Sequence, residues 1–412
     1  MSAVYIVGVG MTPFGKHLET SCSELAQQAA REALADAGIE AGEVDLAFYA
    51  NTAQGSIEGQ MGIKGEHALR PLGVQGAPMF NVENACASSS SGLHLAAAQI
   101  AAGQAEIALV VGAEKLNTKD RDKKFATFNQ PFDYAAAKAF VDRYWNDVAD
   151  IKPPEGVVID ESMRSVFMDI YSINARIHMK RFGTTWEQIA YASSKNHAHS
   201  VKNPLSQYRN EVSTEEVLGA RVISWPLTLP MCAPISDGAS AIVLCSEGAL
   251  KRMAKARPVR LAATAARSGT DRDITDSENS ALRLASRKAF AAAGIGPEDV
   301  AVAEVHDASA FSEITHVEAL GLCEIGQGGA FIASGATTFG GKVPVNLSGG
   351  LQSKGHPVAA TGLAQLFELT KQMRGELDNR KVPNARYAVA SNGGGFIGVE
   401  DAIAVVSVLG QA

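Results

Sequence analysis

The chain has 412 residues, of which 46% are hydrophobic and 20% charged, so it can bury a sizeable core and we expect two domain-sized units. A net charge of -7 with scattered basic residues argues against non-specific nucleic-acid binding, and no apolar run reaches the roughly 18 residues of a membrane-spanning helix. Because the N-terminus opens on strand-like residues without a basic leader, we expect a cytoplasmic protein.

The cysteines form an odd set of five with no C-x-x-C pair. Such a set favours neither a disulfide framework nor a zinc site, so we predict no bound metal. At most one or two of these thiols are expected to be chemically active. The five are Cys22, Cys86, Cys232, Cys245 and Cys323.

An internal repeat organises the chain. Residues 31–47 and 287–303 match without gaps at an offset of 256, with 8 identities in 17 positions. Each copy predicts a helix that ends at a glycine (Gly38 or Gly294), then an acidic turn and a strand. A strand-like run also precedes each copy, at 4–9 and 259–264. The repeat therefore predicts an α/β fold of two pseudo-symmetric βαβ-type halves, residues 1–256 and 257–412.

Each half continues with a strand-like run, a glycine-flanked reactive residue, a helix and another strand. In the first half the strands are 79–82 and 107–111, and the reactive residue is Cys86 at the start of a small-residue helix. In the second half the strands are 343–347 and 387–390, and the residue is His356. If the halves pack about a pseudo-twofold axis, both helix N-termini face one crevice, and Cys86 meets His356.

A thiol at a helix N-terminus meets unpaired backbone N–H groups and the positive end of a dipole, which favour the thiolate and a developing oxyanion. The alternative is that Cys86 is a small buried hydrophobic residue, as free cysteines often are. The flanking serines and glycine, the helix start and the matching His356 favour the chemical reading.

Residues of about 117–235 do not repeat and are expected to form a loop or lid insertion with helices at 163–181 and 186–199. Its aromatic side chains either line a pocket for a bulky ligand or serve ordinary packing. They are Phe128, Phe132, Tyr134 and Trp145.

The chain resembles the thiolases nearly end to end, and most of all the sterol-carrier-protein type. The resemblance rests on the order and spacing of five segments: NACASSSSG around Cys86, the turn at 237–239, VHDA at 305–308, NLSGG at 346–350 leading into GHP at 355–357, and SNGGG at 391–395. It implies a five-layered αβαβα fold and an acyltransferase that uses coenzyme A as co-substrate with no permanently bound cofactor. It also implies a homodimer, and a small zinc-ribbon and OB-fold partner in some relatives.

The same resemblance implies roles for individual residues. Cys86 would attack a 3-oxoacyl-CoA while His356 takes its proton, as in other thiol–imidazole pairs. The oxyanion hole would use His306 and the N–H groups of Cys86 and Gly393. Catalytic roles are also implied for Asp307, which otherwise orients a turn, and for the final glycine loop with Ser391, Asn392 and Gly394.

Substrate contacts are the least defined prediction. The glycine loop is one candidate, and the polar stretch around 195–202 is another, which either reaches CoA phosphates or forms a solvated helix face. The candidates are Ser348, Gly349, Gly350, Lys195 and His197. The remaining histidines, His316 among them, are expected to be surface or packing residues.

The chain departs from the family at the second catalytic cysteine, which protonates the leaving carbanion. Its two usual positions hold Ser391 and Ala308. A serine hydroxyl is too weak an acid to substitute directly. Three hypotheses follow: a thiolase for an unusual, branched or aromatic 3-oxoacyl-CoA; a related acyltransferase or carbon–carbon lyase working with a partner subunit; or a non-catalytic scaffold subunit, which the retained Cys86, His306 and His356 disfavour.

Overall fold

The computed structural model describes residues 2–120, 134–160 and 165–412. Its centre is a nine-stranded sheet of order β3-β2-β4-β7-β1-β8-β11-β10-β9. The first five strands are Met79–Val82, Leu46–Ala50, Ile107–Glu114, Gly238–Ser246 and Val4–Met11, and the other four are Val259–Ser268, Ile403–Gly410, Tyr387–Gly394 and Val300–Val305.

The sheet consists of two halves with matching topology, as the repeat predicted. In the first half β2 runs parallel to β3 and β4, and β7 is antiparallel to β4 and β1. In the second half β9 is parallel to β10, and β11 is antiparallel to β10 and β8. Within the sheet, the two halves are joined by two residue pairs between β1 and β8.

One predicted strand is missing. The run at 343–347 forms only a single bridge, in which Val345 lies parallel to Ala303 of β9. It occupies the place that β3 has in the first half, but Pro344 contributes no N–H to a ladder, so regular pairing stops there.

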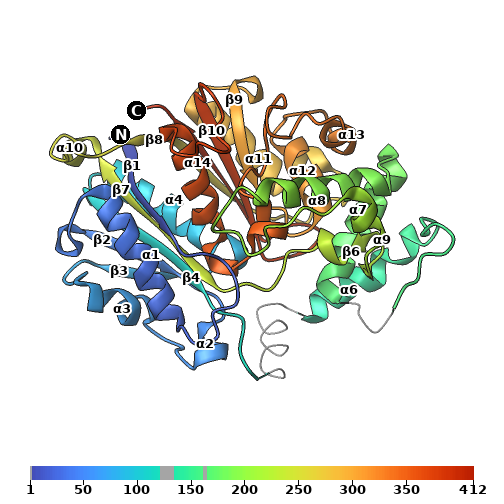
Figure 1. Ribbon diagram of the computed structural model, residues 1–412, viewed down its shortest axis with the longest axis horizontal. Helices are drawn as coiled ribbons and strands as arrows, with labels where there is room; N and C mark the ends of the chain where they lie inside the picture. The colour runs from blue at the N-terminus through green and yellow to red at the C-terminus, as the bar shows by residue number, and fades with distance from the viewer. Residues whose placement is uncertain (1, 121–133, 161–164) are drawn as a thin grey trace.

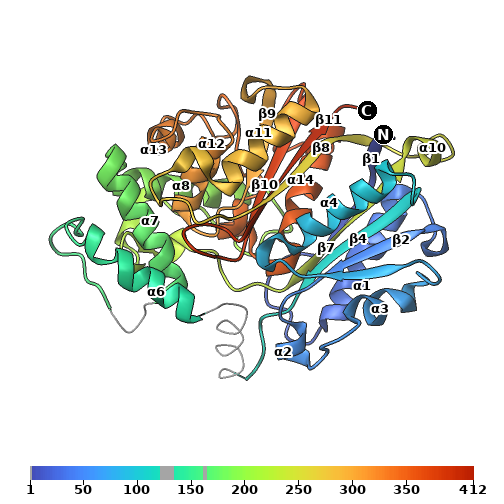
Figure 2. The same ribbon diagram turned by 180° about the vertical axis from the view of Figure 1, so that it is seen from behind.

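Helices cover both faces of each half-sheet, giving the αβαβα layers. Helix α1 (Cys22–Ala37) covers one face of the first half (Figure 1) and α4 (Ser88–Ala101) the other (Figure 2). Helix α14 (Thr361–Arg374) packs beside α4 in the central core, where Leu93 and Phe367 are both buried. Helix α11 (Ala281–Ala293) covers the outer face of the second half.

The close packing of α1 on β1 explains two glycines. A Cβ at Gly8 or Gly10 would lie 2.1 Å or 2.2 Å from the carbonyl oxygens of Ala33 and Ala29, so only glycine permits this approach. Ser21 and Glu24 form a capping box at its start, and the helix ends at the predicted Gly38, which has a φ of 71°. Thus the local signals in the sequence fix both ends of the helix.

The insertion forms a helical cover beside the second half (Figure 1). It contains α6 (Tyr134–Tyr144), α7 (Val166–Phe182), α8 (Trp186–Ser200), α9 (Thr214–Gly219) and the short strands β5 (Val222–Ser224) and β6 (Leu227–Thr228). Helices α7 and α8 match the predicted pair. The remaining α-helices among the described residues are α2 (Gln54–Glu58), α3 (Lys64–Leu69), α10 (Glu247–Leu250), α12 (Ala310–Ala319) and α13 (Gly328–Ala333). In the part of the chain that is described, no helix combines the length and hydropathy needed to span a bilayer.

Candidate active site

Cys86 lies in a tight turn between β3 and α4. A 3-10 turn over Ala85–Ala87 precedes α4, and Ala85 adopts a φ of 47° that residues other than glycine rarely take. Ser88 closes the turn: its hydroxyl donates to the Ala85 carbonyl (2.6 Å) and accepts from the Asn84 N–H (2.9 Å). The turn holds the thiol at the N-terminal end of the helix, as predicted.

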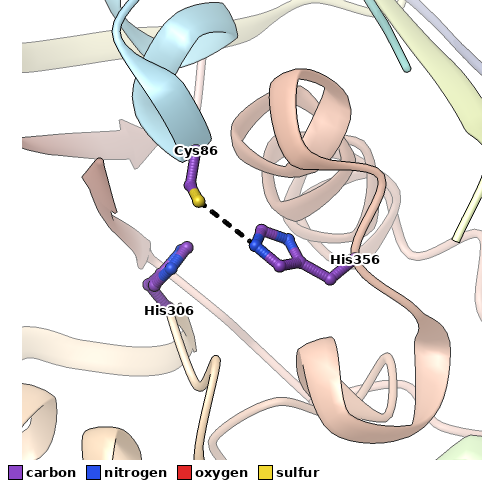
Figure 3. A group of neighbouring side chains, drawn as sticks. All are labelled: Cys86, His306 and His356. Carbon is purple, nitrogen blue, oxygen red and sulfur yellow. Dashed lines mark hydrogen bonds between the residues drawn. The ribbon is translucent and has the colours of Figure 1, made fainter. Parts of the chain in front are cut away.

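His356 meets Cys86 across the interface of the two halves. Its Nε2 lies 3.3 Å from the Cys86 Sγ (Figure 3). Its Nδ1 lies 2.6 Å from the Thr361 hydroxyl oxygen, and that hydroxyl donates to the Pro357 carbonyl. Because the Thr361 proton is used, the Thr361 oxygen accepts from Nδ1–H, which leaves Nε2 unprotonated and facing the thiol.

His306 also lies beside the thiol, and its ring centroid is 5.2 Å from that of His356 in an edge-to-face arrangement (Figure 3). The Ser90 hydroxyl donates to the Asn392 Oδ1 (2.6 Å), and this orients the amide so that its Nδ2 donates to the His306 Nδ1 (2.8 Å). A neutral His306 must then carry its proton on Nε2. The two histidines thus hold opposite tautomers, one ready to accept a proton and one ready to donate a hydrogen bond.

Close packing brings this chain of hydrogen bonds together. A Cβ on Gly362 of α14 would lie 1.8 Å from the Ser90 Oγ and 2.8 Å from the Asn392 Oδ1. Glycine at 362 therefore lets α14 approach α4 closely enough to join the two halves through Ser90 and Asn392.

Burial keeps the resting site uncharged. It raises the pKa of the Cys86 thiol to about 12, with further contributions from Asp401 and Glu114, while the N–H groups of Gly395 and Cys86 act in the opposite direction. Burial also lowers the pKa of His306 to about 4 and that of His356 well below its usual value. The predicted stabilisation of the thiolate by the helix start is therefore outweighed, and the resting pair is a thiol and a neutral imidazole.

A cavity of about 200 Å³ opens from Cys86 between α7, α12 and the final glycine loop. Its wall is largely apolar, and His306 is the polar lining residue shown close to the thiol. The apolar wall includes Phe167, Ile170, Tyr171, Phe311, Phe396 and Val399, and the polar part includes His306, His316, Arg272, Glu400 and Asp401.

Comparison with known proteins places this site in a family. A family model of the thiolase N-terminal domain matches residues 4–223, and one described as thiolase C-terminal domain-like matches residues 262–410. The chain belongs to the thiolase family. It is a thiolase-type acyltransferase.

Named relatives agree with this assignment. The chain is 35% identical to benzoylsuccinyl-CoA thiolase subunit BbsB of Thauera aromatica, over 95% of this chain and 94% of the relative. It is 35% identical to sterol carrier protein 2 of Homo sapiens (98% and 71% covered) and 34% identical to an acetyl-CoA acetyltransferase of Methanothermobacter thermautotrophicus (96% and 97%).

Solved structures share the thiolase fold. The Ltp2-ChsH2(DUF35) aldolase has a TM-score of 0.77 at 24% identity, with 100% of this chain and 98% of that chain covered. Human mitochondrial 3-ketoacyl-CoA thiolase in complex with CoA has a TM-score of 0.67 at 16% identity, with 100% and 98% covered.

Asp307 lies beside the glycine loop at 346–350 and not at the Cys86 thiol. Its carboxylate accepts from the Leu351 N–H (2.7 Å), the Gln352 Nε2 (2.9 Å) and the Asn196 Nδ2 (2.9 Å). It does not line the Cys86 cavity. These contacts support the orienting role that the sequence left open, because they hold the π-helical turn Gly350–Lys354 that precedes His356.

The residues predicted to contact substrate in the loop and on α8 are buried in contacts within the chain. Lys195 pairs with Glu313 (2.7 Å) and donates to the Val345 carbonyl. His197 bonds the Ser353 hydroxyl, and Ser348 bonds Glu304. The other two buried residues are Gly349 and Gly350, and none of the five lines the cavity. Lys195 and His197 therefore do not lie on a solvated face of α8, and their contact with CoA stays a prediction.

The two positions expected for the second catalytic cysteine, 391 and 308, hold no acidic side chain. Ser391 is buried, and its hydroxyl lies 2.8 Å from the Nδ1 of His316, while Ala308 is buried beside His306. Cys232 donates to the Thr228 carbonyl, Cys323 lines a different pocket, and neither thiol lines the Cys86 cavity. The final glycine loop forms the end of β10 at the site, and Gly393 of this loop lines the cavity. The loop consists of Ser391, Asn392, Gly393 and Gly394.

Several site residues escaped the sequence analysis. His316 is buried beside His306 and lines the cavity, rather than being a packing or surface residue. Asp401 and Tyr171 line it as well. Of the aromatic candidates, Trp145 stacks on Arg176, Tyr134 is exposed, and Phe128 and Phe132 lie outside the described residues. No short motif marks His316, Asp401 or Tyr171, so only their place in the fold reveals them.

The thiol and the two imidazoles are also the chemical types that bind zinc, and their ligand atoms lie within 4.8 Å of one another. The hydrogen bonds of the neutral pair and of the Ser90–Asn392–His306 chain already account for this arrangement. The expectation that the protein binds no metal stays a prediction.

Proposed function

We propose that this thiolase cleaves a 3-oxoacyl-CoA with coenzyme A, or runs the reverse Claisen condensation, through an acyl group on Cys86. The observation that carries the proposal is the 3.3 Å contact between the Cys86 Sγ and an unprotonated His356 Nε2. A neutral imidazole at this distance takes the thiol proton as the sulfur attacks the keto carbonyl.

In the cleavage direction, the Cys86 sulfur bonds to C3 of the substrate and His356 receives the proton. The C2–C3 bond then breaks, leaving an acyl thioester on Cys86 and a carbanion that becomes the shorter acyl-CoA after protonation. Coenzyme A attacks the thioester, and Cys86 leaves as a thiolate that recovers its proton from His356. Over the cycle Cys86 and His356 regain their starting protonation states, and the net transfer is one proton from the CoA thiol to C2.

The developing oxyanion needs fixed donors more than the thiol needs ionisation, because one such donor contributes about 100- to 1000-fold to the rate. The His306 Nε2–H, set by Asn392, is one donor in the proposal. The N–H groups of Cys86 and of the glycine loop at Gly393 are the others. Coenzyme A as co-substrate is supported by the CoA-bound human structure of the same fold.

The cavity wall supports a bulky acyl group. Phe167, Tyr171, Phe311 and Phe396 surround the space next to Cys86, which fits a branched or aromatic acyl chain. The relative from Thauera aromatica is named for a benzoylsuccinyl substrate, which agrees with this choice.

The second candidate function is a carbon–carbon lyase that works with a small partner protein. The absence of a thiol at Ser391 and Ala308 favours it, as does the similarity in fold to the Ltp2-ChsH2(DUF35) aldolase. The name of one relative, a thiolase subunit, also supports partner dependence. A homodimer in the cytoplasm completes the proposal.

The experiment uses acetoacetyl-CoA and benzoylacetyl-CoA with and without free CoA. Intact mass measurement reports acylation of Cys86, and chromatography reports the acyl-CoA products. We expect an adduct on the wild-type chain, none on Cys86→Ala, and multiple turnovers, faster with the aromatic substrate, only when CoA is present. Without CoA, cleavage should stop at one equivalent of the enzyme. Turnover beyond one equivalent without CoA would favour the lyase, and neither an adduct nor cleavage with either substrate would refute both enzyme proposals.

A further inference from the structure

The proposed reaction needs an acid that the described cysteines do not supply. The carbanion at C2 must gain a proton, and the CoA thiol must lose one, so one group has to alternate between its protonated and deprotonated forms beside Cys86. Among the cysteines, only Cys86 lines the cavity.

We propose that Asp401 is this group, a second catalytic acid and base that stands in for the missing cysteine. The inference rests on the proposed function of Cys86. It assigns Asp401 the proton transfers that the family's second cysteine performs, from a different point in the chain.

The position of Asp401 carries the proposal. It lies just before β11, two residues ahead of Ile403, and lines the same cavity as Cys86, His306 and Gly393. Its carboxylate rests on the glycine loop, since a Cβ at Gly393 would lie 2.3 Å from the Asp401 Oδ2. Glycine at 393 thus lets a carboxyl group approach the backbone at the proposed oxyanion hole.

The turn that holds Cys86 packs against the same loop. A Cβ at Gly394 would lie 2.6 Å from the Ala87 nitrogen and 2.3 Å from the Asn84 oxygen. Asp401 and the turn that holds Cys86 therefore pack against adjacent glycines of the same loop, and Asp401 and Cys86 both line the cavity.

The carboxyl group of Asp401 has no structural task within the described residues. Its neighbour Glu400 accepts from the Thr270 N–H (2.9 Å), the Arg272 Nε (3.0 Å) and the Ala281 N–H (2.8 Å). Arg272 is thereby committed to Glu400. Among the described residues, burial and the charges of Glu400 and Arg272 act on the Asp401 carboxyl group, and no side-chain hydrogen bond or ion pair holds it, unlike the carboxylate of Glu400.

An unpaired carboxyl group in an apolar cavity favours its neutral form. Burial, and then the charge of Glu400, raise the pKa of Asp401 to about 7, and Arg272 acts in the opposite direction. The other titratable groups that face the same cavity are Cys86, Tyr171, His306 and His316. A pKa near the working pH suits a group that must both give and take a proton.

The proton transfers balance. Protonated Asp401 gives its proton to C2 as the C2–C3 bond breaks, and becomes a carboxylate. The carboxylate then takes the proton of the CoA thiol as the CoA sulfur attacks the thioester on Cys86. A carboxyl group passes through the same neutral and anionic states as a thiol, so it replaces the cysteine without changing the charge of any step.

The nearby alternatives fit less well. His316 is neutral because burial and the neighbouring His306 hold its pKa well below the usual value, and a neutral imidazole that donates its proton becomes a strongly basic anion. The Ser391 hydroxyl faces the His316 Nδ1 and does not line the cavity. Both residues fit a positioning role.

The test compares Asp401→Asn, Asp401→Cys and the exposed control Asp271→Asn with the wild type, each checked for an unchanged melting temperature. Two reagents separate the steps. p-Nitrophenyl acetate acylates Cys86 without an acid, because its leaving group is stable as an anion. The second reagent is whichever of acetoacetyl-CoA and benzoylacetyl-CoA the wild type cleaves faster, and its cleavage needs a proton at C2.

We expect Asp401→Asn to slow single-turnover cleavage of the 3-oxoacyl-CoA by about 100-fold or more, and to change acylation by p-nitrophenyl acetate by less than about 3-fold. Asp401→Cys should recover part of the cleavage rate, and Asp271→Asn should match the wild type. In the wild type, cleavage of the 3-oxoacyl-CoA should slow as pH rises through about 7, where Asp401 loses its proton. This pH dependence should disappear in Asp401→Asn.

Cleavage by Asp401→Asn at close to the wild-type rate would overturn the role of Asp401, as would an equal loss with both reagents. These results leave Cys86 acylation in the wild type intact. A wild-type chain that neither reagent acylates would instead remove the proposed function itself, so the two failures are distinguishable.

Discussion

The chemistry of the Cys86 and His356 pair depends on one hydroxyl. Thr361 accepts from the His356 Nδ1 only because its own proton goes to the Pro357 carbonyl. In Thr361→Val the tautomer of His356 is therefore no longer fixed. We expect kcat to fall about tenfold, the equivalent of one hydrogen bond of roughly 1.4 kcal/mol. Steady-state kinetics check this, with Thr361→Ser as the control that keeps the hydroxyl. Equal kcat values for the valine and serine variants would contradict the assigned tautomer.

The uncharged state of the pair predicts how Cys86 reacts with an alkylating agent. Because burial raises its pKa to about 12, the thiolate fraction should grow with pH throughout the range between pH 6 and 9. The rate of Cys86 carboxamidomethylation by iodoacetamide, followed by mass spectrometry, should rise about tenfold per pH unit. A plateau from pH 6 upward would mean that a thiolate–imidazolium pair already exists.

At this scale the sequence predicted the meeting of Cys86 with His356, because the repeat placed both at equivalent helix starts. It missed Asp401 and misjudged Lys195, and the physical reason is the same. A charged side chain in a helix or loop has the same local pattern whether it faces solvent, a cavity or a buried partner. Only the packing of α8 against α12 brings Lys195 to Glu313.

At the scale of elements, capping residues and hydrophobic spacing were reliable guides. The ends of α1, the paired helices α7 and α8 and strands such as β3 lie where the pattern predicted them. The prediction failed at 343–347, where tertiary context leaves one bridge at the edge of β9. The division of the chain at residue 256 stays a prediction.

Helix α8 is expected to depend on its buried ion pair. Lys195 is the cation that offsets Glu313, and the carboxyl group of Asp307 lies in the same network through Asn196. Lys195→Met leaves Glu313 without its partner, so the free energy of unfolding should fall by about 3–5 kcal/mol.

Urea denaturation measures this change. The control is Lys251→Met, which removes the exposed ion pair with Glu247 and should cost less than about 0.5 kcal/mol. A loss below about 1 kcal/mol for Lys195→Met would show that the pair does not hold α8.

For the whole molecule, the site exists only because two halves pack together. Cys86 and Ser90 come from the first half, whereas His306, His356 and Asn392 come from the second, and Gly362 sets the distance between them. The insertion adds α7 as the wall of the cavity. The halves therefore supply the thiol and the two imidazoles, and the insertion supplies part of the apolar wall beside them.

The outer edge of the sheet predicts how two copies associate. Strand β3 pairs only with β2 within the described residues, and Phe80 on it is 51% exposed. Met61 and Ile63, exposed at 77% and 61%, line a pocket with Asn81 of the same strand. An unpaired edge strand beside apolar side chains is a surface that a second copy would cover.

Light scattering after gel filtration should therefore give twice the 43.2 kDa of one chain. Phe80→Glu places a charge at the centre of the expected contact and should shift the protein to a monomer at micromolar concentration, because a buried unpaired carboxylate opposes association. The control Phe339→Glu changes a phenylalanine exposed to a similar extent, 46%, on a different face beside Lys202, and should remain dimeric. A monomeric wild type, or a Phe80→Glu variant that stays dimeric, would place the contact elsewhere.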